Sequence, residues 1–335
     1  MKIQKNISLK PYTSFGIDAK AAFFAGFTSL TELEELVDYT KSPLLILGGG
    51  SNLLFTQDFQ GLIARNEING IQLIKEDANF YYINAAAGEN WHRFVLYCLD
   101  NNYFGLENLS LIPGNVGASP LQNIGAYGVE IKDVFHSLEA YHLTDKTVHQ
   151  FEAKDCEFGY RESVFKNKFR NQFVILNVTF RLRKNSDLHI AYGAIEQELA
   201  KMHIKDITAR SISEAIIRIR TSKLPDPRVI GNAGSFFKNP VISTQLFEKI
   251  QMQYPEIPGY PLQNGQIKTA AGWLIEQCGW KGYRKGDAGC YEKQALVLVN
   301  YGKAKGAEIN ELAGSIIESV AKKFNIQLER EVNII

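Results

Sequence analysis

The chain has 335 residues, which is enough for two or three domains with buried cores. Hydrophobic residues make up 45% and charged residues 22%, and 37 basic residues nearly balance 36 acidic ones. This balance disfavours a nucleic-acid binder, which needs an excess of lysine and arginine to neutralise phosphates. We find no apolar run of signal-peptide or membrane-spanning length, so we expect a cytoplasmic protein.

The cysteines are scattered along the chain and include no close pair: Cys98, Cys156, Cys278 and Cys290. Their spacing fits neither a zinc site nor a disulfide framework. We therefore expect reduced thiols and predict no metal site.

The N-terminal part has the pattern of a βαβ unit. Residues 21–27 and 44–47 are predicted strands, and Ser29 and Glu32 form a capping-box pattern that begins a helix between them. Three glycines follow the second strand, whereas a dinucleotide-binding Rossmann unit has its glycines after the first. The chain also lacks a GxxxxGK[ST] motif. Both common nucleotide folds are therefore disfavoured, but a phosphate site is not.

The central part is predicted to be an α+β region, with a helix at 91–99 and strands at 81–87, 134–143, 148–151 and 173–182. A second glycine-rich segment, residues 112–128, follows the helix. Glycine-rich loops let several backbone N–H groups turn toward one anion. Two such segments indicate a large phosphate-bearing cofactor that is held at two places.

The C-terminal part begins after an amphipathic helix at 212–220, which has a basic face and ends before two prolines. Beyond this domain edge, residues 231–240 are predicted to form a loop. We expect helices at 270–277 and 306–324 and a short strand at 295–299. The end of the chain, residues 328–335, is predicted to be a strand with both glutamates on one face.

Individual polar residues, taken one at a time, are weak evidence for a catalytic or binding role. Arg161 follows Tyr160 and precedes Glu162, which fits either a solvated ion pair or a two-pronged carboxylate binder. Ser235 has no GxSxG context and no obvious histidine partner, so it is either a turn serine or a proton donor rather than part of a hydrolase triad. Glu331 taken alone is a solvent-facing strand residue. Composition and spacing alone indicate a soluble α/β enzyme or binding protein with a phosphate-rich ligand.

Taken together, a series of segments resembles the UDP-N-acetylenolpyruvoylglucosamine reductase family, flavoenzymes of peptidoglycan precursor synthesis. The matching segments run in the family's order: residues 11–18, 47–54, 112–128, 158–163, 231–240, 271–286, 294–299 and 328–332. So many segments are very unlikely to match the family in the same order by chance. The form of residues 112–123 and the loop that carries Tyr192 resemble the subgroup with an extra substrate-capping loop.

The resemblance implies an α+β fold in which a two-domain FAD-binding module of the vanillyl-alcohol-oxidase-like type precedes a C-terminal α+β substrate-binding domain. It places the first FAD-binding part at residues 1–67, joined by the strand 325–335. The second part covers 68–210, and the substrate-binding domain covers 211–324.

The activity implied by the resemblance is NADPH-dependent reduction of UDP-N-acetylglucosamine enolpyruvate to UDP-N-acetylmuramate through non-covalently bound FAD. NADPH reduces FAD, NADP+ leaves, and the substrate then takes the same space and receives hydride from the flavin at its enol carbon. Ser235 matches the proton donor, and Arg161 and Glu331 match the pair that holds and polarises the carboxylate. No nucleic-acid or membrane partner is expected, and the chain is expected to be a monomer.

The resemblance also implies two groups of binding residues. The cofactor group is Gly48, Gly49, Gly50, Ser51, Asn52, Pro113, Gly114, Gly117, Ala118, Ser119, Asn123, Gly125, Ala126, Tyr127 and Gly128. The group for the substrate or the nicotinamide nucleotide is Tyr127, Tyr192, Lys223, Asn239 and Gln294. The chain departs from the family at Ser14, where asparagine is usual, and at Asn333, where arginine is common. Any salt bridge or phosphate contact that this arginine provides in the family must here come from another residue or be absent.

Two other functions compete with this one. An oxidase of small alcohols on the same FAD domains would often attach its flavin to a histidine, but neither glycine segment contains one. A non-catalytic flavin or UDP-sugar binder would keep the glycine segments without needing Arg161, Ser235 and Glu331 together.

Overall fold

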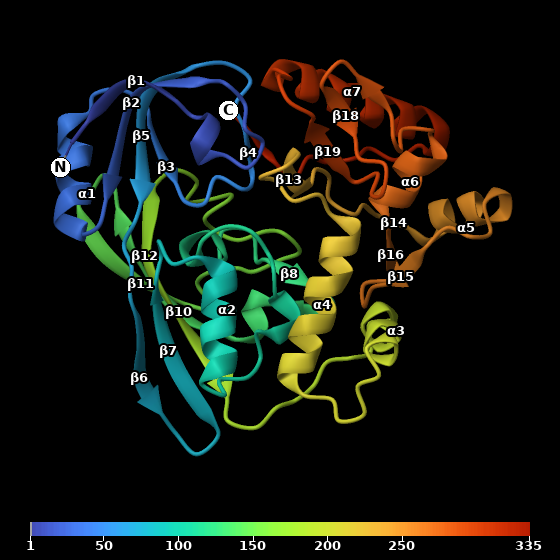
Figure 1. Cartoon of the computed structure of the whole chain (residues 1–335), viewed down its shortest axis with the longest axis horizontal. Helices are drawn as coiled ribbons and strands as arrows, with labels where there is room; N and C mark the ends of the chain where they lie inside the picture. The colour runs from blue at the N-terminus through green and yellow to red at the C-terminus, as the bar shows by residue number, and fades with distance from the viewer. Residues whose placement is uncertain (1) are drawn as a thin grey trace. The chain divides into compact units, whose positions relative to one another are not determined.

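The computed structural model describes residues 2–335 and divides the chain into two compact units (Figure 1). The first unit contains the N-terminal residues to Ile7, Ala21–Gly49 and Gln60–Ser222. The second contains Ser8–Lys20, Gly50–Phe59 and Lys223–Ile335. Each unit is therefore assembled from segments that are far apart in the sequence. The three predicted domain ranges stay a prediction.

The first unit begins with a four-stranded sheet of order β1-β2-β5-β3. Its strands are β1 (Gln4–Ser8), β2 (Lys20–Phe27), β5 (Phe59–Asn66) and β3 (Leu44–Leu47), and β3 runs parallel to β5. Helix α1 (Leu30–Tyr39) starts as predicted, because Ser29 Oγ accepts the Glu32 N–H at 3.2 Å. The Glu32 carboxylate in turn accepts a hydrogen bond from the Thr28 N–H. The buried side chains of α1 pack against this sheet.

The largest sheet of the first unit has five antiparallel strands in the order β11-β10-β12-β7-β6. They are β6 (Ile71–Glu76), β7 (Phe80–Ala86), β10 (Phe135–His142), β11 (Thr147–Glu152) and β12 (Phe173–Arg183). Helix α2 (Trp91–Asp100) buries Trp91 and Phe94 against Phe180, with ring centroids 5.9 and 4.9 Å from that ring. Each of these buried aromatic side chains stabilises the fold by ~1.5–3 kcal/mol.

Two further helices of the first unit share an apolar cluster that includes Ile195 and Ile216. They are α3 (Gly193–Lys201) and α4 (Ala209–Lys223), and α4 is longer at both ends than the predicted 212–220. Short elements complete the unit: β8 (Gly125–Ala126), β9 (Val129–Glu130) and single helical turns at Glu107–Leu109, Val116–Ala118 and Ile131–Asp133.

The second unit contains a sheet of order β13-β19-β18-β17 and a smaller one of order β14-β16-β15. The strands are β13 (Gly231–Ser235), β19 (Val297–Asn300), β18 (Ala288–Cys290), β17 (Arg284–Lys285), β14 (Val241–Ser243), β16 (Gln266–Thr269) and β15 (Gly259–Pro261). The other elements are a turn at Lys10–Tyr12, the helices α5 (Thr244–Gln253), α6 (Ala271–Gln277) and α7 (Gly306–Phe324), and the parallel pair β4 (Leu53–Leu54) and β20 (Asn333–Ile334).

The structure corrects two predictions in this unit. Residues 231–240 were expected to be a loop, but their first half is β13, which pairs with β19. The N–H of Asn232 on β13 also donates to Ser14 O at 3.0 Å. The predicted strand at 328–335 is regular only at β20. Leu328 and Val332 are nevertheless buried, as its alternation indicated.

Residues 2–335 lack two structural features, a membrane-spanning helix and a metal-binding cluster. No helix in this part of the chain is both long and apolar enough to cross a membrane. No group of three or more histidine, cysteine, aspartate or glutamate side chains there is placed to hold a metal ion.

Candidate functional site

The two glycine segments meet inside the first unit. A Cβ added to Gly49 would lie 2.9 Å from Gly114 Cα and 2.9 Å from Asn115 Oδ1, so only glycine permits this approach. Gly114 O accepts the Trp91 N–H at 3.0 Å, which fixes the second segment at the start of α2. Gly117 packs against Ala87, where a Cβ would lie 2.5 Å from the alanine Cβ. Gly49 of the first predicted cofactor loop and Gly114 of the second are therefore in direct contact.

In the second unit, Gly50 lies beside two hydroxyl groups that have no hydrogen-bond partner within residues 2–335. Its φ is +62°, and a Cβ there would lie 2.0 Å from Tyr12 O. Its carbonyl accepts the Ser14 N–H at 3.0 Å. Thr13 Oγ1 and Ser14 Oγ are buried and have no hydrogen-bond partner among residues 2–335. Free hydroxyl donors beside a side-chain-free backbone fit an anion such as the FAD diphosphate.

Several side chains of the second glycine segment are used to hold the segment itself. Ser119 Oγ donates to Val116 O at 2.6 Å, and the buried Asn123 donates from Nδ2 to Gly159 O at 2.9 Å. These two residues would therefore contact a cofactor through their main-chain atoms. The same holds for the residues without polar side chains: Pro113, Gly114, Gly117, Ala118, Gly125, Ala126 and Gly128.

Arg161 contacts the second glycine segment directly, because its Nη2 donates to Gly125 O at 2.8 Å. Its guanidinium carbon also lies 5.5 Å from the ring centre of Tyr160. Arg161 and Tyr127 have φ values of 57° and 50°, in the left-handed region that costs energy for residues other than glycine. Such strain is concentrated at functional sites.

The two tyrosines predicted to bind substrate lie together in the first unit. The ring of Tyr192, which is 47% exposed, stands edge-on to that of Tyr127 with centroids 5.4 Å apart. Asn108 Nδ2 joins their loops by donating to Tyr127 O at 3.0 Å and to His189 O at 2.9 Å. Burial is the main cause that raises the pKa of Tyr127, so its phenol is neutral near pH 7.

Ser235 and Glu331 lie on paired segments of the second unit. The Glu331 N–H donates to Phe236 O at 2.8 Å, and Phe237 forms an antiparallel bridge with Arg330. Ser235 is half-buried at the end of β13, and no residue of the described range 2–335 forms a hydrogen bond with its Oγ. The structure thus presents a hydroxyl with no internal partner next to the segment that carries Glu331.

The first glycine loop is also tied to the segment of Glu331. Asn52 Nδ2 donates to Glu331 O at 3.2 Å. Asn333, the residue that departs from the family, donates from its main-chain N and from Nδ2 to Asn52 O, both at 3.1 Å. The amide of Asn333 therefore helps to hold the neighbouring loop at Asn52. Sequence reasoning did not foresee these contacts, since they join positions far apart in the chain.

The remaining predicted residues lie in the second unit. Asn239 Oδ1 accepts the Ala271 N–H at 3.0 Å at the start of α6, and Gln294 Oε1 accepts the Leu296 N–H at 3.3 Å. Both amide nitrogens remain available as donors. Lys223 ends α4, is exposed, and forms no ion pair within the described part of the chain.

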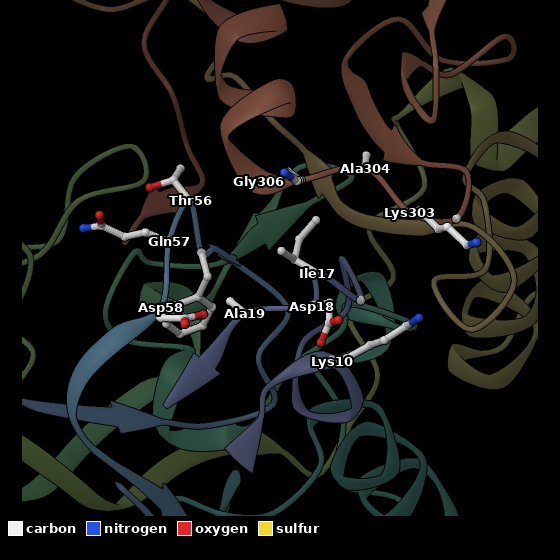
Figure 2. Close-up of a pocket in the computed structure, with 14 residues that line it drawn as sticks. Lys10, Ile17, Asp18, Ala19, Thr56, Gln57, Asp58, Lys303, Ala304 and Gly306 are labelled. Carbon is white, nitrogen blue, oxygen red and sulfur yellow. The ribbon is translucent and has the colours of Figure 1, made fainter. Parts of the chain in front are cut away.

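A separate cavity of about 490 Å³ in the second unit includes none of the predicted residues (Figure 2). Lys10, Lys303 and the start of α7 line it, together with two aspartates. Asp18 accepts a bond from Ser8 Oγ at 3.0 Å and Asp58 accepts the Lys20 N–H at 2.8 Å, so both carboxylates are engaged. Glu308 caps the helix by accepting the Lys305 N–H at 2.7 Å. This cavity plays no part in the candidate site.

Two family models match the chain. A model described as "FAD binding domain" matches residues 21–151, which include both glycine segments. A model described as "UDP-N-acetylenolpyruvoylglucosamine reductase, C-terminal domain" matches residues 226–335, which include Ser235 and Glu331. The predicted combination of an FAD-binding module with a C-terminal α+β domain is confirmed.

Named relatives match over the full length. The UDP-N-acetylenolpyruvoylglucosamine reductase of Pseudomonas syringae pv. syringae is 50% identical over 337 residues, which cover 100% of this chain and 99% of the relative. That of Flavobacterium johnsoniae is 49% identical and fully covered. The crystal structure of the Thermus caldophilus enzyme of this name has a TM-score of 0.69 at 23% identity, covering 100% of this chain and 99% of that one, which shows the same fold.

Proposed function

Because the chain belongs to the UDP-N-acetylenolpyruvoylglucosamine reductase family, we propose that it reduces UDP-N-acetylglucosamine enolpyruvate to UDP-N-acetylmuramate with NADPH. It is an FAD-dependent oxidoreductase of peptidoglycan synthesis. FAD bound in its FAD-binding domain would supply the redox chemistry that carries hydride from NADPH to the terminal enol carbon of the substrate.

The proximity of the Ser235 and Glu331 segments is the observation that carries this proposal. Hydride addition to the enol carbon places negative charge on the carbon beside the carboxylate. The Ser235 hydroxyl has no internal partner within residues 2–335, so it can donate its proton to that carbon. A well-placed general acid typically accelerates a reaction ~10²–10⁴-fold.

Arg161 and Glu331 hold and polarise the substrate carboxylate in this proposal. A guanidinium binds a carboxylate in a two-pronged geometry and stabilises negative charge that spreads onto it. The bond to Gly125 O at 2.8 Å orients Arg161 before the substrate arrives. A preoriented cation favours the transition state over the ground state, because the charge develops only during the reaction.

The remaining proposals concern binding. The main chain of Gly48, Gly49, Gly50, Ser51 and Asn52 and of the second glycine segment holds FAD, with Thr13 and Ser14 as hydroxyl donors to its diphosphate. Tyr127 and Tyr192 contact the substrate as a pair, and Lys223, Asn239 and Gln294 offer one charged and two amide groups to its polar parts. A three-domain division, a cytoplasmic location and a monomeric state complete the proposal.

The visible spectrum of the purified protein under anaerobic conditions tests this function. We expect a yellow protein that bleaches with NADPH and recovers its colour when UDP-N-acetylglucosamine enolpyruvate is added. Bleaching without recovery would retain the flavoprotein and reject the substrate. A colourless protein that takes up no added FAD would reject the function entirely.

A further inference from the structure

Arg161 lies in a tight turn of the first unit, between two residues that are joined by main-chain hydrogen bonds. The Gly159 N–H donates to Glu162 O at 3.0 Å, and the Glu162 N–H donates to Gly159 O at 3.3 Å. Arg161 is the third residue of this turn and has a φ of 57°, in the left-handed region where glycine or asparagine is usual. A residue keeps such a strained backbone only where the surrounding structure holds it.

Two buried side chains hold this turn against the second glycine segment. Asn123 is fully buried, and its Nδ2 donates to Gly159 O at 2.9 Å, at the start of the turn. Ser163 is buried directly after the turn, and its Oγ donates to Leu121 O at 2.7 Å. The main chain is therefore tied to the glycine segment on both sides of Arg161. We call the side chains of Asn123 and Ser163 the turn clamp.

The guanidinium of Arg161 is tied to the same glycine segment. Its Nη2 donates to Gly125 O at 2.8 Å. Gly125 belongs to β8, which pairs with β9, and it lies opposite Glu130 in this pairing. The Glu130 carboxylate accepts a hydrogen bond from Asn123 Nδ2 at 3.0 Å. Asn123 therefore links the support of the turn to the hairpin that supports the guanidinium.

These contacts occupy the amide of Asn123. Its Nδ2 donates to Gly159 O and to the Glu130 carboxylate, and its Oδ1 accepts the Lys132 N–H at 3.1 Å. An amide nitrogen has two N–H donors, so neither is left for a ligand. A buried amide that is satisfied in this way fixes the segments around it. The side chain of Asn123 therefore acts on the protein rather than on a cofactor.

We propose that Asn123 and Ser163 are positioning residues for Arg161 and hold its guanidinium where it binds the substrate carboxylate. The carboxylate-binding role of Arg161 rests on the proposed function, whereas the turn clamp rests on the hydrogen bonds above. A two-pronged pair requires the guanidinium and the carboxylate to face each other in one geometry. A misplacement of about 1 Å can cost roughly 10²-fold in rate, so the anchoring of the turn matters for the reaction.

Three variants provide the comparison. Asn123 has a φ of 44°, which glycine adopts readily, so Asn123→Gly removes the amide and permits the same backbone. Ser163→Ala removes one hydrogen bond of the turn clamp. Asn167→Ala is the matched control, because the exposed Asn167 donates to the Glu162 carboxylate at 3.1 Å on the solvent side of the turn. If Asn123→Gly failed to fold, Ser163→Ala would replace it in every comparison.

The first measurement is amide hydrogen exchange across residues 159–162, followed by mass spectrometry on the purified FAD-bound protein without NADPH or substrate. We expect about tenfold faster exchange in Asn123→Gly and a smaller increase in Ser163→Ala, because the turn opens more often when a support is lost. Asn167→Ala should match the wild type. Unchanged exchange in the first two variants would overturn the turn clamp.

The second measurement is the rate at which substrate reoxidises the reduced flavin, by stopped-flow absorbance in a double-mutant cycle with Arg161→Ala. We expect Asn123→Gly to slow reoxidation about tenfold when Arg161 is present. In the Arg161→Ala background the effect should be less than about twofold, because no guanidinium remains to be positioned. Reduction by NADPH should keep its rate, since NADPH brings no carboxylate. An equal slowing in both backgrounds would overturn the positioning role.

Two further outcomes separate this proposal from the proposed function. Unchanged reoxidation in Arg161→Ala alone would reject the carboxylate-binding role of Arg161, while hydrogen exchange would still confirm or reject the turn clamp. If Asn123→Gly weakened FAD binding about tenfold or more and left the reoxidation of FAD-saturated protein unchanged, the amide would belong to the cofactor site. That result would reject Asn123 as a positioning residue.

Discussion

Asn52 donates its side-chain amide to the main-chain oxygen of Glu331 over 3.2 Å. The carbonyl of Asn52 in turn accepts two bonds from Asn333, and β4 and β20 continue this pairing in parallel. The end of the first glycine loop and the proposed carboxylate-binding glutamate are therefore parts of one hydrogen-bonded assembly. A displacement of that loop would move the Glu331 backbone with it.

Replacing Asn52 with aspartate should slow the reoxidation of the flavin by substrate. The change keeps the shape of the side chain, removes the N–H donor and adds a negative charge beside Glu331 O, so we expect at least the loss of one neutral hydrogen bond, about 1 kcal/mol, or roughly fivefold in rate. Stopped-flow absorbance gives the two half-reactions separately. Asn333→Ala is the matched control, because its main-chain bond to Asn52 remains. Weaker FAD binding with unchanged reoxidation would assign Asn52 to the cofactor alone.

Ser235→Ala should slow flavin reoxidation by ~10²–10⁴-fold while leaving reduction by NADPH at its normal rate. The asymmetry follows from the proposed proton transfer, which belongs to the second half-reaction only. Single-turnover absorbance measurements separate the two steps. Ser315→Ala, on the exposed side of α7, serves as a control for loss of a hydroxyl. An equal slowing of both steps would argue against Ser235 as the proton donor.

Gly49→Ala should weaken FAD binding and lower the thermal midpoint, whereas Gly48→Ala should change both far less. The added methyl at 49 would lie 2.9 Å from Gly114 Cα, while the methyl at 48 would meet its nearest neighbour, Asn115 Cβ, at 3.7 Å. Overpacking of this kind typically costs ~1–3 kcal/mol. Melting curves with and without FAD, and cofactor retention on ultrafiltration, measure the effect. Equal behaviour of the two variants would contradict the close approach of the loops.

His92 should make the protein less stable as the pH falls. Burial, and then Arg220, lower the folded pKa of His92 below 6.5. As the pH falls through about 6.5, the unfolded chain binds a proton that the folded chain does not, so the stability from neutral His92 is lost. The free energies of unfolding of the wild type and of His92→Gln can be measured with urea from about pH 8 to pH 5. The amount by which the wild type exceeds the variant should be smaller at the acid end.

The control for this titration is His189→Gln, since His189 is an exposed side chain. If the two variants followed the same pH dependence, the perturbed titration of His92 would be rejected.

Elements with strong local patterns were predicted well. The apolar strands β10 and β12 lie close to their expected bounds, and helix α1 begins directly after its predicted cap, Ser29. Strand β13 was missed because the sequence of Gly231–Ser235 contains no strand-forming side chain. Its pairing with Val297 and Val299–Asn300 holds it extended. Strand β6 was missed because most of its side chains are exposed, so burial leaves no alternating pattern.

The candidate site followed from an ordered set of motifs and not from any single residue. Ser235 and Glu331 have ordinary sequence contexts, and only the pairing of their segments gives them a common place. Arg220 was predicted to belong to the basic face of its helix, and in the structure it is half-buried whereas Arg218 is exposed. Burial of one charge in a helical stripe depends on tertiary packing, which composition and periodicity do not encode.

The interleaved assembly of the two units has a consequence for biosynthesis. Ser8–Lys20 and Gly50–Phe59 leave the ribosome early, yet their unit also needs Lys223–Ile335. Chains emerge from the ribosome N-terminus first. Most segments of the first unit can therefore fold while Ser8–Lys20 and Gly50–Phe59 still lack the C-terminal part of their own unit. The loop at Asn52 acquires its strand partner only when β20 has been synthesised, so newly made chains should remain protease-sensitive at residues 50–59 until translation ends.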